Sequence, residues 1–179
     1  MKYYFDMETT GLNPHFEDAE ILTTQFMDDD GNFKVFTRWE LSEKDLIEKT
    51  QNFFVEINFR QRAYPTYNPI FTYNGGFDFH YLMGRIGYLF NEKEKRVLHN
   101  TMIRYSKHCD LLQFNNGYYV SLQKLVNKHN IKRKTNFMGS DIYELYKKQE
   151  YESIVNHAYD DVNILKQLVN NYGYGGRFL

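Results

Sequence analysis

The hydrophobic pattern at the start of the chain predicts three strands. Residues 2–8 are rich in Tyr and Phe without clear alternation, which is typical of a strand buried on both faces. A second apolar run covers residues 21–27, and a third covers residues 33–39. The sequence DDDGN between them is a turn signal, so we expect a first strand followed by a β-hairpin.

Helical periodicity dominates the rest of the chain. Ser42 and Asp45 form a capping-box pattern that opens a predicted helix through about Phe54. We also expect a short strand at 70–74 and another within 101–114, around Ile103 or Cys109–Leu112. Further helices are expected over residues 75–90, 121–131, 140–147 and 151–171. The pattern predicts a single α/β domain over residues 1–179, in which helices flank a central mixed β-sheet.

Composition neither indicates nor excludes a nucleic-acid partner, because 22 basic and 23 acidic side chains leave a net charge of -1. The basic residues cluster in 93–107 and 124–134, and the simplest explanation of each cluster is a solvated face. The one cysteine, Cys109, excludes an internal disulfide, and no Cys/His spacing indicates zinc. We see neither a signal peptide nor a membrane span, and expect a reducing, cytoplasmic setting.

Four carboxylates stand out from this background. Asp6 and Glu8 are two residues apart on the first strand, so they point to the same face and repel each other unless a cation lies between them. Asp78 lies between two phenylalanines at the start of a predicted helix, and Asp161 lies within the last helix. Taken singly, Asp78 is explained by the helix dipole and Asp161 by exposure to water.

Together, the four acids suggest a metal site. A first strand, a helix that follows a later strand and a final helix can converge on one point in an α/β fold. Hard oxygen ligands select Mg²⁺ or Mn²⁺, and a pair of such ions suits in-line attack of water on a phosphodiester.

Three motifs resemble those of a known family. The sequences FDMETTGL, YNGGFDFHYL and HAYDDVNIL resemble, in order and rough spacing, the three motifs of the DEDD 3′–5′ exonucleases. The similarity is greatest to the stand-alone and proofreading exonucleases related to family B DNA polymerases. Residues 109–114, 121–131 and 139–165 also resemble that group, so the likeness spans nearly the whole chain.

The resemblance implies an RNase H-like fold that releases nucleoside 5′-monophosphates from a 3′ end. Asp6, Glu8 and Asp161 would bind the first of two Mg²⁺ or Mn²⁺ ions. Asp6 would share the second ion, and Asp78 would hold it mainly through water. The substrate would be single-stranded nucleic acid, DNA in preference to RNA. The substrate-binding residues would be Thr10, Leu12, Asn74 and Phe77, with Leu12 wedged against the terminal base.

The third motif departs from the family at His157. The polymerase-like branch has a tyrosine four residues before the aspartate, where this chain has His157. The histidine branch has its imidazole five residues before, where this chain has Asn156. Because His157 and Asp161 share a helix face, we hypothesise that His157, with an unperturbed pKa of ~6.5, takes the proton of the attacking water or orients that water. An ordinary helix histidine is the alternative, and Tyr159 is poorly spaced for the role.

Several alternatives remain open. The same fold could serve an exoribonuclease or oligoribonuclease, a non-enzymatic nucleic-acid-binding module or an RNase H-like endonuclease. A separate polymerase or a replication or repair protein could be a partner. Surface tyrosines could stack on unpaired bases. The candidates for phosphate contacts are Arg104, Lys107, Lys124, Lys128, Lys132, Arg133 and Lys134.

Overall fold

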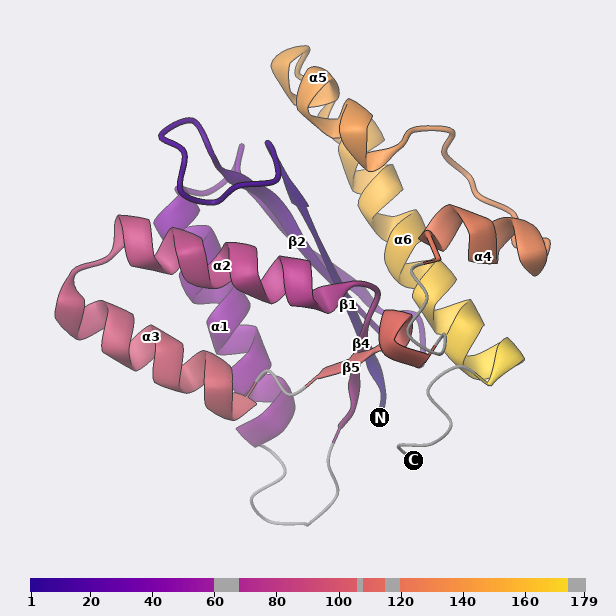
Figure 1. The fold of residues 1–179 in the computed structure, drawn as a ribbon, viewed down its shortest axis with the longest axis horizontal. Helices are drawn as coiled ribbons and strands as arrows, with labels where there is room; N and C mark the ends of the chain where they lie inside the picture. Colours follow the sequence, from indigo (N-terminus) through magenta and orange to yellow (C-terminus); the bar gives the residue numbers. More distant parts are fainter. Residues whose placement is uncertain (60–67, 106–107, 115–119, 174–179) are drawn as a thin grey trace.

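A five-stranded mixed sheet forms the centre of the protein, with helices on both faces (Figure 1). The structure is a computed structural model that describes residues 1–59, 68–105, 108–114 and 120–173. Its strands are β1 (Tyr3–Thr9), β2 (Ile21–Asp28), β3 (Phe33–Thr37), β4 (Ile70–Thr72) and β5 (His108–Asp110). Its helices are α1 (Glu43–Phe59), α2 (Gly75–Leu89), α3 (Glu92–Tyr105), α4 (Leu122–Lys128), α5 (Ile142–Lys147) and α6 (Tyr151–Tyr172). The described residues also include the 3₁₀ turns η2 (Leu111–Phe114) and η3 (Gly139–Asp141).

The strand order is β3-β2-β1-β4-β5, which places β1 in the middle. β2 is antiparallel to β1 and to β3, so the predicted hairpin forms and pairs with the first strand. β1, β4 and β5 run parallel to one another. The pairing of β1 with β2 shifts register between Glu8 and Thr9, an irregularity of the kind often found beside functional sites. The predicted mixed sheet is confirmed.

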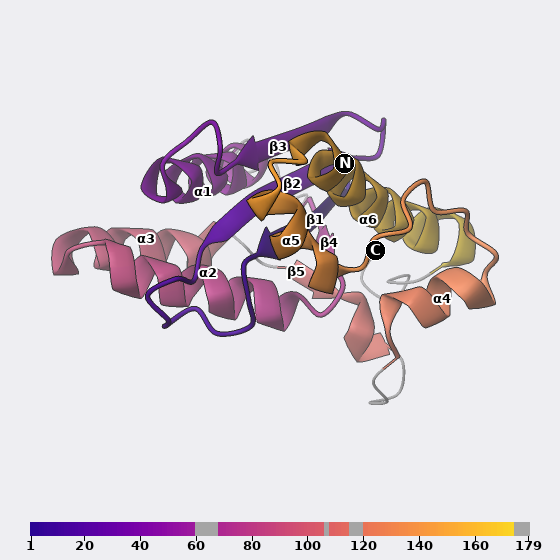
Figure 2. The same cartoon turned by 90° about the horizontal axis from the view of Figure 1, so that it is seen from above.

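Side chains from the two faces of β1 enter two separate hydrophobic clusters. Phe5 and Met7 pack with residues of α1, α2 and α3, whereas Tyr4 packs on the other face with residues of α4 and α6. Figure 2 shows the same layering, with α1, α2 and α3 apart from α4 and α6. Tyr4 and Phe5 are both fully buried, which confirms the prediction that the first strand is covered on both faces.

The middle of the chain differs from the sequence prediction. Residues around Ile103 belong to α3 rather than to a strand, and the strand expected in this region is β5, at the alternative position around Cys109. α3 packs on the core with a short apolar stripe of Leu98, Met102 and Tyr105, of which only Met102 is fully buried, while Ile103 is 71% exposed.

Element boundaries also differ: β4 ends at Thr72 rather than at residue 74, and α4 ends at Lys128 rather than at residue 131. β3 ends at Thr37 rather than Trp39, whose ring instead stacks on Tyr151 at 4.5 Å between centroids. α1 begins where predicted, with the Asp45 amide donating to Ser42 Oγ at 3.2 Å, but it continues to Phe59. Within the described part of the chain, no helix has the length and apolar character to cross a membrane.

Candidate active site

The carboxyl ends of the three parallel strands bring acidic residues to one edge of the sheet. Glu8 is the second-last residue of β1, Asp110 is the last residue of β5, and α2 begins three residues after β4 ends. Such an edge is where ligands bind in open α/β sheets. Asp78, in the first turn of α2, therefore lies near the acids of β1.

A tight junction fixes the start of α2. Asn74 adopts the left-handed conformation, with a φ of 58°, and its amide donates to Asp110 Oδ1 at 2.8 Å. A Cβ atom on Gly75 would lie 2.2 Å from Thr72 Oγ1, so only glycine fits this close approach. Asp78 is consequently held in the first helical turn and is only 4% exposed.

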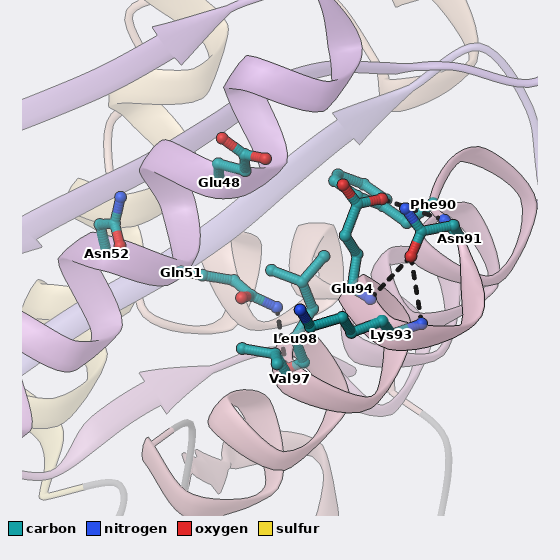
Figure 3. Close-up of a pocket in the computed structure, with 9 residues that line it drawn as sticks. All are labelled: Glu48, Gln51, Asn52, Phe90, Asn91, Lys93, Glu94, Val97 and Leu98. Carbon is teal, nitrogen blue, oxygen red and sulfur yellow. Dashed lines mark hydrogen bonds between the residues drawn. The ribbon is translucent and has the colours of Figure 1, made fainter.

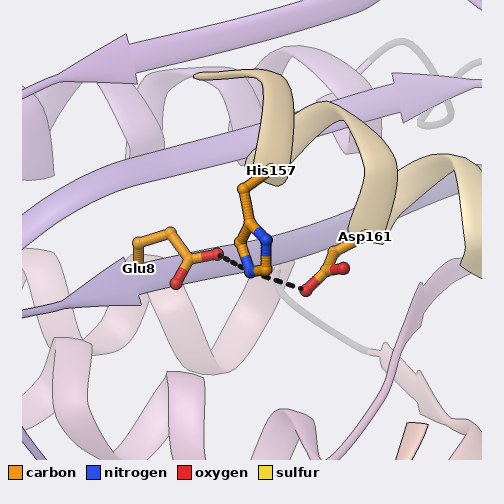
Figure 4. Close-up of side chains that lie close together, drawn as sticks. All are labelled: Glu8, His157 and Asp161. Atoms are coloured by element: carbon orange, nitrogen blue, oxygen red, sulfur yellow. Dashed lines mark ion pairs between the residues drawn. The ribbon is translucent and has the colours of Figure 1, made fainter. Parts of the chain in front are cut away.

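Glu8, His157 and Asp161 form a compact group (Figure 4). His157 Nε2 lies 3.7 Å from Glu8 Oε1 and 3.5 Å from Asp161 Oδ2. One ligand atom from each of the three residues lies within 4.8 Å of the others, which is a spacing that can hold a metal ion. The helix places His157 and Asp161 on the face of α6 that meets β1, as their i, i+4 spacing predicts.

Asp6 lies beside this group and is oriented by a partner that was not predicted. Gln25 is fully buried on β2, directly opposite Asp6, and its Nε2 donates to Asp6 Oδ2 at 2.7 Å. Thr23 Oγ1 in turn donates to Gln25 Oε1 at 2.8 Å. A buried amide in the middle of the apolar run ILTTQFM was the signal that could have identified this interaction.

The acids perturb one another strongly. Burial raises the pKa of Asp6 to about 6. Burial, followed by the charges of Asp6 and Asp78, raises the pKa of Glu8 well above its usual range. Burial and then the charge of Asp6, with a smaller contribution from Asp110, also raises the pKa of Asp78. These mutual effects show that Asp6, Glu8 and Asp78 share one electrostatic environment.

His157 is less basic than the sequence suggested. Burial and then the positive charge of Arg133 lower its pKa to about 4, in place of the expected ~6.5. The imidazole is therefore neutral at physiological pH. A neutral ring of this basicity is better suited to orienting a water molecule than to carrying its proton away.

Asp160 and Arg133 are the further residues that complete the site. Arg133 forms an ion pair with Asp161, and Gln123 Oε1 accepts a hydrogen bond from Arg133 Nη1 at 3.1 Å. Asp160 is 2% exposed, and its Oδ2 accepts hydrogen bonds from the amides of Lys134 and Thr135, each at 2.7 Å. The position of Asp160, three residues after His157 on the inner helix face, was the available signal.

The four residues predicted to bind substrate differ in their exposure and in their contacts. Leu12 is 85% exposed in the loop after β1, Phe77 is half-buried and packs on Tyr81, and Asn74 is exposed before α2. Thr10 is occupied inside the loop, where its hydroxyl donates to the Asp18 carbonyl and accepts from the Glu20 amide.

A buried ion pair holds the loop that carries Leu12. Arg85 of α2 pairs with Glu43 of α1 through Nη2 and Oε2 at 2.8 Å, and both side chains are nearly inaccessible. Arg85 Nη1 also donates to the carbonyls of Pro14 and Phe16. Exposed Leu12 is therefore presented by a loop that is fixed to the scaffold.

The two basic stretches do not form one surface. Arg104 lies on α3, whereas Lys124 and Lys128 lie on α4, and these helices cover opposite faces of the sheet (Figure 1). Lys132, Arg133 and Lys134 follow α4, while Lys107 lies outside the described residues. The candidates for phosphate contact nearest the acids are thus in residues 132–134.

A separate cavity of about 550 Å³ lies between α1 and α3 (Figure 3). Gln51 of α1 bridges to α3 there, because its Nε2 donates to the Leu98 carbonyl at 3.0 Å. None of the predicted site residues lines this cavity. It lies on the opposite side of the sheet from the side chains of Tyr4, Asp6 and Glu8.

The residues at the acidic edge fit divalent metal ions. Three carboxyl groups have raised pKa values because their charges are crowded and buried, so a cation would relieve a repulsion that is already present. The donor atoms are carboxylate oxygens, which Mg²⁺ and Mn²⁺ prefer, and the imidazole of His157 lies beside them.

The mixed sheet, its flanking helices and the acids at the edge of its parallel strands define an RNase H-like nuclease fold. The chain belongs to the RNase_H superfamily, whose family profile matches residues 3–172. It is also similar in structure to the family B DNA polymerase from the hyperthermophilic archaeon Pyrobaculum calidifontis, with a TM-score of 0.70 at 16% identity.

That similarity covers 94% of this chain but only 24% of the polymerase chain, and at this identity it concerns the fold alone. No curated protein sequence matches the chain. The RNase H-like fold expected from the three motifs is confirmed, and membership of the RNase_H superfamily agrees with the expected relationship.

Proposed function

We propose that the protein is a metal-dependent 3′–5′ exonuclease that acts on single-stranded DNA and releases nucleoside 5′-monophosphates. The observation that carries this proposal is the gathering of Asp6, Glu8, Asp78 and Asp161 at one edge of the sheet, with three of their carboxyl groups perturbed by burial and mutual repulsion. A binding module would gain nothing from such a group, because it repels the phosphate backbone.

The carboxylates would hold two Mg²⁺ or Mn²⁺ ions. Asp6, Glu8 and Asp161 are the proposed direct ligands, and Asp78 acts mainly through water. When bound, such ions activate the attacking water and stabilise the leaving 3′ oxygen. Gln25 contributes by orienting the Asp6 carboxylate through its 2.7 Å hydrogen bond.

His157 would position the attacking water. Its Nε2 lies between the carboxylates of Glu8 and Asp161, and its lowered pKa keeps the ring neutral at pH 7 and able to accept a hydrogen bond. Thr135 Oγ1 lies 3.5 Å from Nδ1 on the other side of the ring. The ring is therefore buried between partners that fix its orientation.

The substrate end would be held from the loop after β1 and from the start of α2. Leu12 is available as a wedge, because 85% of it is exposed on a loop that Arg85 and Glu43 anchor. Phe77 offers a half-buried ring on the first turn of α2, and Asn74 immediately precedes that turn. Thr10 supports the loop rather than contacting the nucleotide directly.

The test uses a single-stranded DNA oligonucleotide labelled at its 5′ end. We expect a ladder that shortens from the 3′ end in Mg²⁺ or Mn²⁺, and an intact substrate with EDTA or with Asp6→Ala. The matched control is Asp30→Ala, which removes an exposed acid from the β2–β3 turn.

Two further substrates separate the alternatives. A circular single-stranded DNA has no 3′ end, so its cleavage would contradict an exonuclease and indicate an endonuclease. Faster shortening of an RNA of the same sequence would assign the protein to RNA. Intact DNA and RNA in every metal condition would refute the proposed activity.

A further inference from the structure

We propose that Arg133 is a built-in counter-ion of the acidic site, and that a divalent metal ion displaces its guanidinium from Asp161. This inference rests on the proposed metal site, and it assigns to Arg133 a role as a positioning residue. In the absence of metal, Arg133 would neutralise part of the charge of the acids. When a metal ion binds, the ion pair between Arg133 and Asp161 would break.

The ion pair between Arg133 and Asp161 is partly buried. The two side chains are only 15% and 16% exposed, so water screens their charges much less than at a surface pair. The carboxylates of Asp160, Glu8 and Asp6 are also close enough for their charges to act on the guanidinium. Arg133 thus interacts with the same acids that would bind the metal.

The fold directs Arg133 into this position. Asp160 binds the amides of the next two residues, Lys134 and Thr135, and so fixes the backbone of this segment against α6. Lys134 points to a different place, with its ammonium group 4.7 Å from the centre of the Tyr159 ring. The guanidinium of Arg133 is therefore presented to the acids by a buried anchor rather than by chance rotation of a surface side chain.

The contact with Asp161 is suited to exchange. Among the residues that the structure describes, Arg133 Nε is buried and has no hydrogen-bond partner, so the guanidinium is incompletely satisfied where it lies. A divalent ion would compete for the same Asp161 carboxylate and would repel the guanidinium. Gln123 accepts a hydrogen bond from Arg133, and both residues line a neighbouring cavity of about 400 Å³ that offers room for movement.

A released guanidinium would remain beside the site. Arginine binds phosphate through paired hydrogen bonds, so Arg133 could then contact a phosphate of the nucleic-acid chain. The same side chain would therefore pair with the acids before metal binds and contact a substrate phosphate afterwards.

The experiment measures Mn²⁺ affinity without substrate, from the electron paramagnetic resonance signal of free Mn²⁺. The proteins are wild type, Arg133→Gln, Arg133→Lys and the control Arg38→Gln, which removes a more exposed pair with Glu20. We expect Arg133→Gln to bind Mn²⁺ about tenfold more tightly, because the metal no longer competes with a partly buried charge. Arg133→Lys keeps the charge and should stay within about threefold of wild type, as should Arg38→Gln.

The outcomes separate the inference from the function on which it rests. Mn²⁺ binding by wild type with equal or weaker binding by Arg133→Gln would overturn the counter-ion role alone. Equal tightening in Arg133→Gln and Arg133→Lys would also overturn it, because charge would not be the cause. If neither wild type nor Arg133→Gln binds Mn²⁺, the proposed metal site fails and the inference fails with it.

A thermal-shift measurement covers the case of a variant that folds poorly. In EDTA, Arg133→Gln should melt below wild type, because the acids have lost their counter-charge. Saturating Mn²⁺ should then raise its melting temperature more than it raises that of wild type. An equal rise in both proteins would contradict the exchange.

Discussion

Replacing Asp6 with asparagine should stabilise the metal-free protein while removing a proposed metal ligand. Asparagine is close in size to aspartate, and its Oδ1 can still accept the hydrogen bond from Gln25 Nε2. The substitution therefore removes one partly buried charge with little change in packing. It also relieves Glu8 and Asp78, whose pKa values the Asp6 charge raises.

The expected gain follows from the pKa of Asp6. Burial raises that pKa from 3.8 to about 6 in the folded protein, so the folded state binds the proton more tightly than the unfolded chain. The stabilisation that the protonated Asp6 carboxyl group contributes to the folded state is fully present below pH 4, and it is lost as the pH rises through 6. At about 1.36 kcal/mol per pKa unit, the charge costs about 3 kcal/mol at pH 7.5 and about half of that at pH 5.

The assay is urea unfolding in EDTA, followed by fluorescence of the single tryptophan. Trp39 stacks on Tyr151, so its environment changes when α6 separates from the hairpin. Asp6→Asn should be more stable than wild type by about 3 kcal/mol at pH 7.5, with a smaller difference at pH 5.

The control is Asp29→Asn near the other end of the β1–β2 pair, because it should act in the opposite direction. Burial alone would raise the pKa of Asp29, but hydrogen bonds from the Lys2 amide and the Tyr4 hydroxyl lower it overall. Its stabilising effect is present at neutral pH and is lost on acidification, so Asp29→Asn should destabilise at pH 7.5. An Asp6→Asn protein that is no more stable than wild type at pH 7.5 would refute the electrostatic reasoning.

Three further predictions concern the scaffold, the water and the substrate. Arg85→Met should cost about 3–5 kcal/mol in urea unfolding, because Glu43 is left buried and unpaired; a full-length double variant that also carries Glu43→Leu should recover most of this loss. His157→Ala should lower turnover by about 100-fold at both pH 7 and pH 8, because the attacking water is no longer held in place, and unchanged turnover would contradict its role. Leu12→Ala should leave stability within ~0.5 kcal/mol but weaken oligonucleotide binding in fluorescence anisotropy, and unaltered binding would contradict the wedge.

The sequence predicted those elements whose burial leaves a clear pattern. β1 could be read as a central strand because aromatic residues occupy both of its faces, and both faces are covered. α3 was not predicted, because it contacts the core through only a short stripe of Leu98, Met102 and Tyr105 and is otherwise dominated by charged and polar residues. Three apolar positions within such a polar segment are a weak signal for a helix, although their spacing is helical.

The acids of the candidate site were identifiable as a group, although Asp78 and Asp161 each have a simple explanation when taken singly. A carboxylate beside buried aromatic residues needs an explanation, and spacing along one strand and one helix supplied it for Asp6, Glu8 and Asp161. Arg133, Gln25 and Asp160 carry no such mark. Arginine in a basic run is usually solvated, and its contact with Asp161 joins residues 28 apart in the sequence. Only the tertiary structure shows this pairing.

The position of β1 explains why paired carboxylates are informative in this chain. Two acids on an exposed edge strand would be solvated, and their mutual repulsion would be weak. On the central strand the same spacing places Asp6 beside buried Gln25 and Glu8 beside buried His157, where solvation is poor. The hydrophobic clusters on both faces of β1 must therefore offset the unfavourable free energy of placing these acids at the carboxyl end of the strand. Any cation bound there should stabilise the whole fold, which couples metal affinity to stability at this site.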